Sequence, residues 1–215
     1  MPKQLLIVGS GGYAKEVAQI ARRIDPSLNA WSPISYVAAA PADIGQPRPY
    51  GTIDYCDADV LGGAVTADVV IALGETASRR PAAARYSKLP MLSFPNLIDP
   101  SVEIDLGFVT LGIGNVIHQR TVITCDIVIG DFNVFNKGCI IAHDVRVGSF
   151  NDIYPAASLH GYSRLGNGCV VGAGSRVLPK VSVADQTTIG AGAILLRDVS
   201  EPGHVYGGVP AKRLR

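Results

Sequence analysis

A six-residue period in the apolar residues runs through the second half of the chain, and it constrains the fold more than any other feature. From Leu111 onward, every sixth residue is apolar for fifteen consecutive positions. These positions are Leu111, Ile117, Ile123, Ile129, Phe135, Ile141, Val147, Ile153, Leu159, Leu165, Val171, Val177, Val183, Ile189 and Leu195. Neither the roughly 3.6-residue period of an α-helix nor the two-residue period of an ordinary strand produces this pattern.

Self-similarity at a short fixed period is typical of a hexapeptide-repeat parallel β-helix. Each hexad supplies a short strand and a corner. The apolar residue points into a prism, the small residue that often follows it lets the chain turn, and stacked coils bury a continuous core. Three hexads close a triangular coil of about 18 residues, which predicts about five coils and a prism roughly 24 Å tall. A sandwich or barrel would show alternating strands and irregular turn spacing instead.

Composition and charge exclude several classes of function. The net charge is +1, and no basic or acidic run points to nucleic acid. No apolar run approaches the roughly 18 residues of a membrane span, and no signal peptide is recognised, so we expect a cytoplasmic protein. The four cysteines, Cys56, Cys125, Cys139 and Cys169, lack the spacing of metal ligands. We interpret them as small buried residues in a reducing compartment.

The first part of the chain has an α/β pattern. A strand from Lys3 to Val8 runs into a turn of Gly9, Ser10, Gly11, Gly12 and Tyr13, and a helix is expected from about Ala14 to Arg23. In a Rossmann-like domain such a turn lets the backbone approach a phosphate beside free helix N–H groups. The full dinucleotide spacing and the acidic residue about 20 positions further on are missing, so NAD binding is not predicted.

Later elements complete two expected domains. Strands are predicted near residues 34–37, 68–73 and 92–94, a helix over 78–88 and a loop over 41–52. Ligands of such sheets bind beyond the carboxyl ends of the strands, here at the glycine turn and Gly74. The predicted fold is therefore a Rossmann-like α/β domain, residues 1–95, followed by an all-β parallel β-helix with a C-terminal tail, residues 96–215.

The coil period places chemistry-bearing side chains above one another. Cys125, His143 and Gly161 are 18 residues apart and share one position on successive coils, with His160 and Asp144 in neighbouring positions. A histidine beside a carboxylate is the minimal unit of general base catalysis. A solvated corner histidine is the alternative interpretation. A zinc site would need histidines from several faces, so no metal site is predicted within one chain.

Two glycine-rich corners suggest a slot for a thin ligand. Gly172-Ala173-Gly174 and Gly190-Ala191-Gly192 are 18 residues apart, so they stack and expose backbone groups. A pantetheine arm, which carries amides, suits such a slot, and Lys212 and Arg213 of the tail suit phosphates. Glycines that merely allow tight corners explain part of this pattern as well.

Taken together, these features resemble a known family, the bacterial hexapeptide-repeat sugar acetyltransferases of the sialic acid O-acetyltransferase and nucleotide-linked amino-sugar N-acetyltransferase type. The motifs are LLIVGSGGYAKEVAQIA at 5–21, VVIALGE at 69–75, IIAHDVRVG at 140–148, VVGAGSRVLP at 170–179, TTIGAGAILLRDV at 187–199 and GGVPAKRL at 207–214. The repeat alone is shared by many acyltransferases. The Rossmann-like half combined with the AHD motif and the tail is more specific.

The resemblance implies a left-handed β-helix, a homotrimer, and acetyl-CoA as co-substrate between adjacent prisms. It implies that His143 is the catalytic base, Asp144 its carboxylate partner and the Gly161 N–H the oxyanion contact. The family's groove for the CoA arm matches Ala173 and Ala191. Its acceptor site matches Asn136 and, in the first domain, the Gly9–Gly12 turn with Tyr13 and Gly74. The implied reaction is N-acetylation of a nucleotide-linked amino sugar for bacterial surface glycans.

Two departures from the family pattern bear on the acceptor. Where relatives commonly carry a second histidine, this chain has Asp152, and His160 is the candidate that compensates for it. Relatives that bind a uridine nucleotide often have paired aspartates in the stretch that matches residues 36–40, which here reads YVAAA. O-acetylation of a sialic-acid-like sugar, a metal-dependent hydratase on the same prism and a non-catalytic scaffold remain alternatives.

Overall fold

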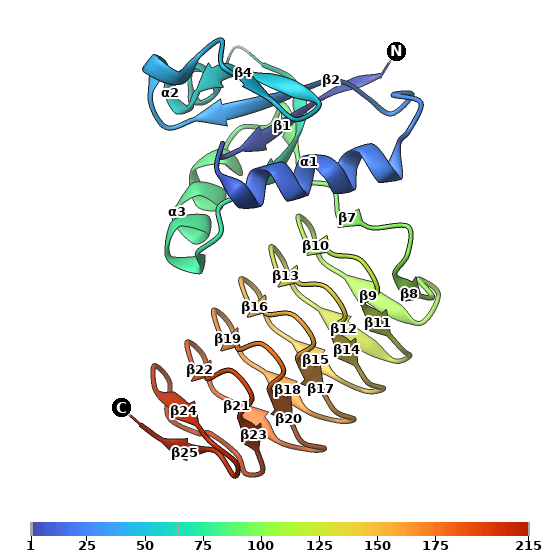
Figure 1. Cartoon of the computed structure of the whole chain (residues 1–215), viewed down its shortest axis with the longest axis vertical. Helices are drawn as coiled ribbons and strands as arrows, with labels where there is room; N and C mark the ends of the chain where they lie inside the picture. Colours follow the sequence, from blue (N-terminus) through green and yellow to red (C-terminus); the bar gives the residue numbers. More distant parts are fainter. Residues whose placement is uncertain (1, 64, 215) are drawn as a thin grey trace. The chain divides into compact units, whose positions relative to one another are not determined.

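The computed structural model describes residues 2–63 and 65–214, and it divides into two compact units (Figure 1). The first unit reaches to Leu97 and the second begins at Ile98. No helix of the described residues is long and apolar enough to cross a membrane. Each unit has its own core, and the two are described separately below.

The first unit is a six-stranded sheet with three α-helices. The strands lie in the order β3-β4-β2-β1-β5-β6, and all pairs are parallel except β3 with β4. The elements are β1 (Lys3–Val8), α1 (Gly12–Ile24), β2 (Trp31–Ala38), η1 (Pro41–Asp43), β3 (Pro47–Arg48), β4 (Gly51–Cys56), α2 (Asp57–Leu61), β5 (Ala67–Ile71), α3 (Thr76–Tyr86) and β6 (Leu92–Ser93). This arrangement confirms the Rossmann-like α/β prediction.

Helix α1 and strand β4 differ from the expectation. Helix α1 begins at Gly12, two residues before the predicted Ala14, because the last glycine of the turn and Tyr13 already have helical geometry. The segment predicted as a loop over 41–52 contains η1 and β3 and runs into β4, which is followed by α2. Prolines and glycines concealed these elements, and β4 lies near the sheet edge, where only Ile53 and Cys56 of its residues are buried.

The second unit is a left-handed parallel β-helix of three sheets, as predicted. The first sheet contains β25-β24-β22-β19-β16-β13-β10-β7, the second β23-β20-β17-β14-β11-β8, and the third β21-β18-β15-β12-β9. In chain order the strands are β7 (Leu97–Ile98), β8 (Glu103–Ile104), β9 (Val109–Leu111), β10 (Val116–Ile117), β11 (Val122–Ile123), β12 (Ile127–Ile129), β13 (Val134–Phe135), β14 (Ile140–Ile141), β15 (Arg146–Val147), β16 (Asp152–Ile153), β17 (Ser158–Leu159), β18 (Arg164–Leu165), β19 (Val170–Val171), β20 (Arg176–Val177), β21 (Ser182–Val183), β22 (Thr188–Ile189), β23 (Ile194–Leu195), β24 (Val205–Gly207) and β25 (Lys212–Arg213).

Strand register confirms the coil period, because residues 18 apart pair along each sheet, as Phe135 does with Ile153. The apolar positions from Ile117 to Leu195 are all buried, and Leu111 packs against the same core.

The interpretation of the cysteines as buried residues is correct for Cys56, Cys139 and Cys169 and wrong for Cys125, which is exposed at a corner. Burial raises the pKa of the Cys139 thiol to about 12 and that of Cys169 to about 11, so both stay protonated.

At the corner that follows the second sheet, one residue in each of four successive coils has a left-handed backbone conformation. Asp126, Asp144, Tyr162 and Lys180 have φ of 57°, 61°, 63° and 67°. Backbone bonds hold the coils in register, from the Asp144 N–H to Cys125 O at 3.1 Å and from the Tyr162 N–H to His143 O at 3.1 Å. The residues that precede these four, among them His143 and Gly161, therefore lie above one another on successive coils.

A ladder of buried asparagines ties together the coils before the first sheet. Asn133 Nδ2 donates to Asn115 Oδ1 at 3.0 Å, and Asn133 Oδ1 accepts from the backbone N–H and Nδ2 of Asn151, both at 2.9 Å. Asn151 Oδ1 in turn accepts from the Cys169 N–H at 2.7 Å. All three asparagine side chains are fully buried. The ladder supplies acceptors for corner amides that water cannot reach.

Replacing Asn133 with alanine is expected to lower the free energy of unfolding by about 2–4 kcal/mol, because buried groups on both sides lose their partners. Urea denaturation followed by circular dichroism measures the change. Asn167→Ala is the matched control, since its ladder with Asp185 lies at the exposed surface. We expect that variant to lose about 1 kcal/mol or less, because water replaces the amide. Equal losses in the two variants would contradict a special role for the buried ladder.

Candidate active site

His143 projects outward from the corner that follows the second sheet, and Asp144 is its direct neighbour. Nδ1 of His143 lies 2.9 Å from Oδ2 of Asp144, and the histidine side chain is 54% exposed. With the carboxylate accepting from Nδ1–H, the lone pair of the ring is on Nε2, which faces away from Asp144. The pair therefore has the arrangement of a histidine base oriented by a carboxylate.

Gly161 lies one coil after His143 and leaves space for its ring. A Cβ at this position would lie 2.8 Å from Cε1 and 2.9 Å from Nε2 of His143, closer than real Cβ atoms come to other heavy atoms. Within residues 2–63 and 65–214, the Gly161 N–H has no hydrogen-bond acceptor, although the N–H groups of the residues on either side are both bonded. The site thus combines a base nitrogen with a free backbone donor close by.

Tyr162 contacts His143 as well, and the sequence analysis assigned it no role. The two ring centroids are 5.3 Å apart and the rings are almost perpendicular, at 86°. This edge-on packing is a favourable arrangement of aromatic rings. The coil period could have identified this neighbour of His143, because Tyr162 follows Asp144 by 18 residues and therefore lies next to it on the following coil. The imidazole is therefore held by Asp144, Gly161 and Tyr162 together.

The remaining predicted residues of the prism do not all meet at this corner within one chain. His160 does lie beside it, but its Nε2 bonds to Ser158 Oγ at 3.1 Å rather than to His143. Asn136 follows β13 and Asp152 lies buried in β16, so both belong to the first sheet. Ala173 and Ala191 also follow strands of the first sheet, where the Gly192 N–H bonds to Ala173 O at 2.8 Å. The glycine corners therefore stack as predicted, but on a different edge from His143.

The basic tail residues flank a cavity at the end of the prism. Strand β25 pairs antiparallel with β24, so Lys212 and Arg213 are presented on a short hairpin. The cavity has a volume of about 460 Å³, and Arg197, Tyr206, Lys212 and Arg213 are among its lining residues. Arg213 pairs with Glu201 at 2.9 Å, while Lys212 and Arg197 form no ion pair with other described residues. These cations are available to an anionic ligand.

In the first unit, a cavity of about 460 Å³ lies beyond the carboxyl ends of the central strands. Gly9 and Ser10 line it, whereas Gly11, Gly12, Tyr13 and Gly74 do not. At Gly9, φ is +117° and a Cβ would lie 2.8 Å from Ala72 O, so this glycine serves the approach of β1 to β5. Beside Gly11 and Gly12 a Cβ would meet no atom within 4 Å, which leaves open space at the start of α1.

Asp57 and Arg85, which the sequence analysis missed, also line this cavity. Arg85 Nη2 lies 3.0 Å from Asp57 Oδ2, and the Tyr86 hydroxyl donates to Asp57 Oδ1 at 2.6 Å. Burial, with the Asp57 carboxylate beside it, raises the pKa of Tyr86. Asp57 begins α2, an element that the sequence analysis did not predict, so no signal placed it near the glycine turn.

No group of three or more potential metal-ligating side chains occurs in the part of the chain that the structure describes. His118 is fully buried at the end of β10, in the first sheet and thus away from His143. The site at His143 has the geometry of a histidine base beside the free backbone N–H of Gly161.

Comparison with known proteins gives the class. No protein-family model matches the chain. It is similar to a perosamine N-acetyltransferase from Caulobacter crescentus solved with CoA and GDP-perosamine, with 26% identity, TM-score 0.86, and coverage of 98% of this chain and 96% of the other. It is also similar to the acetyltransferase domain of PglB from Neisseria gonorrhoeae in complex with acetyl coenzyme A, with 25% identity, TM-score 0.88 and full coverage of both chains.

WeeI from Acinetobacter baumannii shares the fold, with 20% identity, TM-score 0.85, and coverage of 98% of this chain and 99% of the other. The resemblance predicted from the sequence is therefore confirmed. In fold and site the chain resembles the bacterial hexapeptide-repeat sugar acetyltransferases, and its class is that of an acetyl-CoA-dependent sugar acetyltransferase.

Proposed function

We propose that the protein transfers an acetyl group from acetyl-CoA to the amine of a nucleotide-linked amino sugar, with His143 as general base, in the synthesis of bacterial surface glycans. The observation that carries the proposal is the contact of His143 Nδ1 with Asp144 at 2.9 Å, with Gly161 directly beside the ring. Two solved neighbours at 25% identity or above are acetyltransferases, and one of them was solved with GDP-perosamine. Acetyl-CoA and a nucleotide-linked sugar as substrates support a cytoplasmic location for the proposed reaction.

The proposed chemistry is direct acyl transfer. The acceptor nitrogen attacks the thioester carbonyl carbon while Nε2 of His143 takes a proton from the amine. Asp144 stabilises the imidazolium that forms, and the Gly161 N–H donates to the carbonyl oxygen as negative charge develops there. The C–S bond then breaks, and the CoA sulfur leaves as the thiol with the proton from His143. The exposed Cys125 is not needed as a nucleophile.

The division of predicted residues between two prism edges supports a homotrimer. His143, Asp144 and Gly161 lie on the edge that follows the second sheet, whereas Asn136, Ala173 and Ala191 lie on the edge that follows the first. Closed cyclic symmetry would bring the two kinds of edge together from adjacent chains. In this arrangement the stacked corners at Ala173 and Ala191 hold the pantetheine arm, and Lys212 and Arg213 meet phosphates. Asn136 and Asp152 then contact the acceptor from the neighbouring chain.

We assign the cavity of the first unit to part of the acceptor. Its position at the carboxyl ends of β1, β2 and β5 is where parallel α/β sheets bind ligands. Gly9, Ser10, Asp57 and Arg85 are among its lining residues. Gly11 caps α1 and Gly12 and Tyr13 begin it, so the N-terminus of this helix faces a phosphate of the acceptor, and Gly74 lies against Tyr13.

Release of CoA thiol tests the function directly. Purified protein and acetyl-CoA are mixed with GDP-, UDP- and dTDP-linked amino sugars, the matching free amino sugars, and free sialic acids. Fast release with a nucleotide-linked amino sugar is expected. Release with a sialic acid alone would move the assignment to O-acetylation. Absence of release across the panel, in a protein that binds no acetyl-CoA, would favour the scaffold alternative.

The ring contact of Tyr162 predicts a measurable effect on turnover. Tyr162→Ala is expected to lower kcat about two- to tenfold, because a well-placed aromatic pair is worth about 0.5–1.5 kcal/mol and here it orients the base. Tyr162→Phe keeps the ring and is expected to retain most of the parent kcat. The same thiol assay at saturating substrates measures both. Equal losses of kcat in the two variants would mean that the hydroxyl group, and not the aromatic ring, is responsible.

A further inference from the structure

A carboxylate and a guanidinium group lie side by side on the wall of the cavity in the first unit. Asp57 begins α2 and Arg85 lies in the last turn of α3, and both line the cavity. The two side chains contact each other, yet they are 30% and 52% exposed, so a ligand can reach both. Apolar residues form much of the remaining wall, namely Val8, Val37, Ala39, Leu73, Pro81 and Ala82. Such a cavity suits a flat ligand with apolar faces and a polar edge.

The strand order fixes how far Asp57 lies from the glycine turn. Strand β4 pairs with β2, and β2 pairs with β1, so the ends of β1 and β4 are two strand spacings, or roughly 10 Å, apart. Between them, β2 ends at Ala38 and Ala39 follows, where dinucleotide-binding folds hold a ribose with a carboxylate. With the acceptor's diphosphate at the glycine turn, Asp57 therefore lies beside the group beyond the ribose, which is the base.

Asp57 and Arg85 retain hydrogen-bonding capacity beyond their contact with each other. Oδ1 of Asp57 accepts from the Tyr86 hydroxyl at 2.6 Å, and Oδ2 accepts from Nη2 of Arg85 at 3.0 Å. A carboxylate offers about four lone-pair sites, so each oxygen of Asp57 can accept once more. The other N–H groups of Arg85 have no partner in the part of the chain that the structure describes. The pair therefore presents two acceptors beside free donors.

We propose that Asp57 and Arg85 recognise guanine, so that the acceptor is a GDP-linked amino sugar. Guanine presents N1–H and an amino group side by side, which match the two oxygens of one carboxylate, and its O6 beside them accepts from a guanidinium group. Uracil and thymine have a single N–H between two carbonyl oxygens, so one oxygen of Asp57 would face a carbonyl oxygen with no proton between them. Adenine has an acceptor, N1, where the carboxylate needs a donor. The inference rests on the function proposed above and specifies its substrate class.

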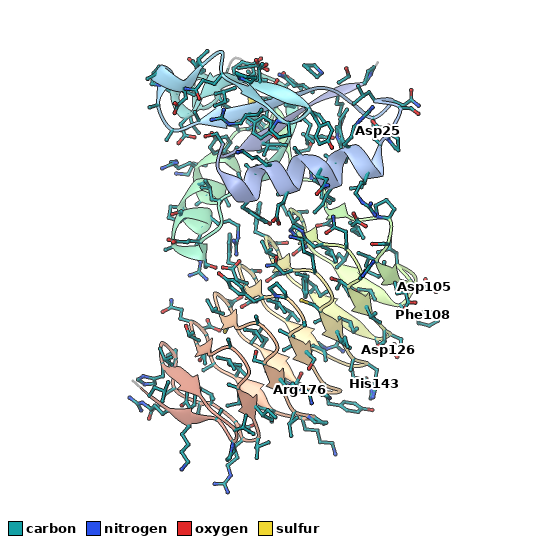
Figure 2. The ribbon with its side chains drawn as sticks, viewed as in Figure 1. Asp25, Asp105, Phe108, Asp126, His143 and Arg176 are labelled. Carbon is teal, nitrogen blue, oxygen red and sulfur yellow. The ribbon has the colours of Figure 1, made fainter. Side chains whose placement is uncertain are left out.

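Isothermal titration of GDP, UDP, dTDP and CoA into the full-length protein tests the assignment, and GDP is expected to bind more tightly than UDP or dTDP. In Asp57→Asn, the affinity for GDP should fall about 10- to 100-fold, since a bidentate contact to a base discriminates by about this factor. The affinity for UDP should not fall, because an amide can accept from N3–H of uracil and donate to O4. Asp105→Asn is the matched control, since it makes the same exchange at an exposed carboxylate of the second unit (Figure 2) and should change neither affinity.

Arg85→Met is a second test that leaves the Asp57 carboxylate in place. It removes the donor to O6 and should lower the affinity for GDP about tenfold, the usual worth of a hydrogen bond from a charged group. Lys88→Met, the control, removes an exposed positive charge just after the same helix and outside the cavity lining, and it should leave GDP binding unchanged. An unchanged affinity for CoA in every variant checks that the protein is folded.

Three results would overturn the inference. The first is a parent that binds GDP no more tightly than UDP and dTDP, or binds none of them, and the second is an unchanged GDP affinity in Asp57→Asn. The third is an equal fall in GDP and UDP affinity in that variant, which would assign the carboxylate to the ribose. The thiol assay separates these from a failure of the proposed function. A parent that acetylates UDP-linked amino sugars in preference to GDP-linked ones refutes the guanine site, whereas a parent that releases no CoA with any acceptor refutes the reaction.

Discussion

Replacing His143 with alanine is expected to reduce kcat by about 10²–10⁴-fold, the usual worth of proton transfer by a positioned side chain. The ring is half exposed and contributes nothing to the apolar core, so the variant should fold like the parent. Its affinity for acetyl-CoA should remain nearly unchanged, because the proposed coenzyme contacts lie on the other edge. Single-turnover kinetics and a binding titration measure the two quantities separately.

Asp144→Asn is the companion variant. It leaves the base in place but replaces the carboxylate that accepts from Nδ1 at 2.9 Å, so the imidazolium loses its stabilising charge. We expect a smaller loss of kcat than for His143→Ala. A larger loss would mean that the carboxylate, not the imidazole, is the principal base. Turnover of His143→Ala within a few-fold of the parent would remove that histidine from the mechanism.

The second large effect is expected at Gly161. A methyl group there would lie 2.8 Å from His143 Cε1, so the ring must leave the position that it occupies above Gly161. The backbone N–H of residue 161 remains, but the displaced ring can no longer take the proton of the acceptor, and the loss of a positioned base costs at least about 10²-fold in kcat. Gly161→Ala should therefore reduce turnover by at least that amount although a single methyl group is added.

The control for Gly161→Ala must separate a local displacement from a folding defect. Gly161 is absent from the residues with left-handed backbone, so alanine adds no backbone strain. The thermal midpoint should stay close to that of the parent, and acetyl-CoA should still bind. A crystal structure of the variant would show the His143 ring rotated away. Parent-level turnover in a folded Gly161→Ala protein would contradict the proposed arrangement of base and donor.

The six-residue period determined most of the second unit. A repeat of short strands and corners leaves one way to bury its apolar positions, so the buried core from Ile117 to Leu195 could be predicted residue by residue. The same arithmetic predicted that His143 and Gly161 would stack, since residues 18 apart must lie on successive coils. Sequence also indicated the Asp144 contact, because adjacent corner residues project from the same place.

Only the tertiary structure decided which residues of the glycine turn line the cavity of the first unit. It placed Gly9 and Ser10 in the lining and left Gly11, Gly12 and Tyr13 outside it. It also joined Asp57 to Arg85 beside the glycine turn. These contacts depend on how separate strands and helices pack in the first unit, where no repeat fixes the register. In the periodic β-helix, the spacing of residues along the sequence fixes which side chains are neighbours. In the α/β unit, the neighbours depend on how the strands and helices pack.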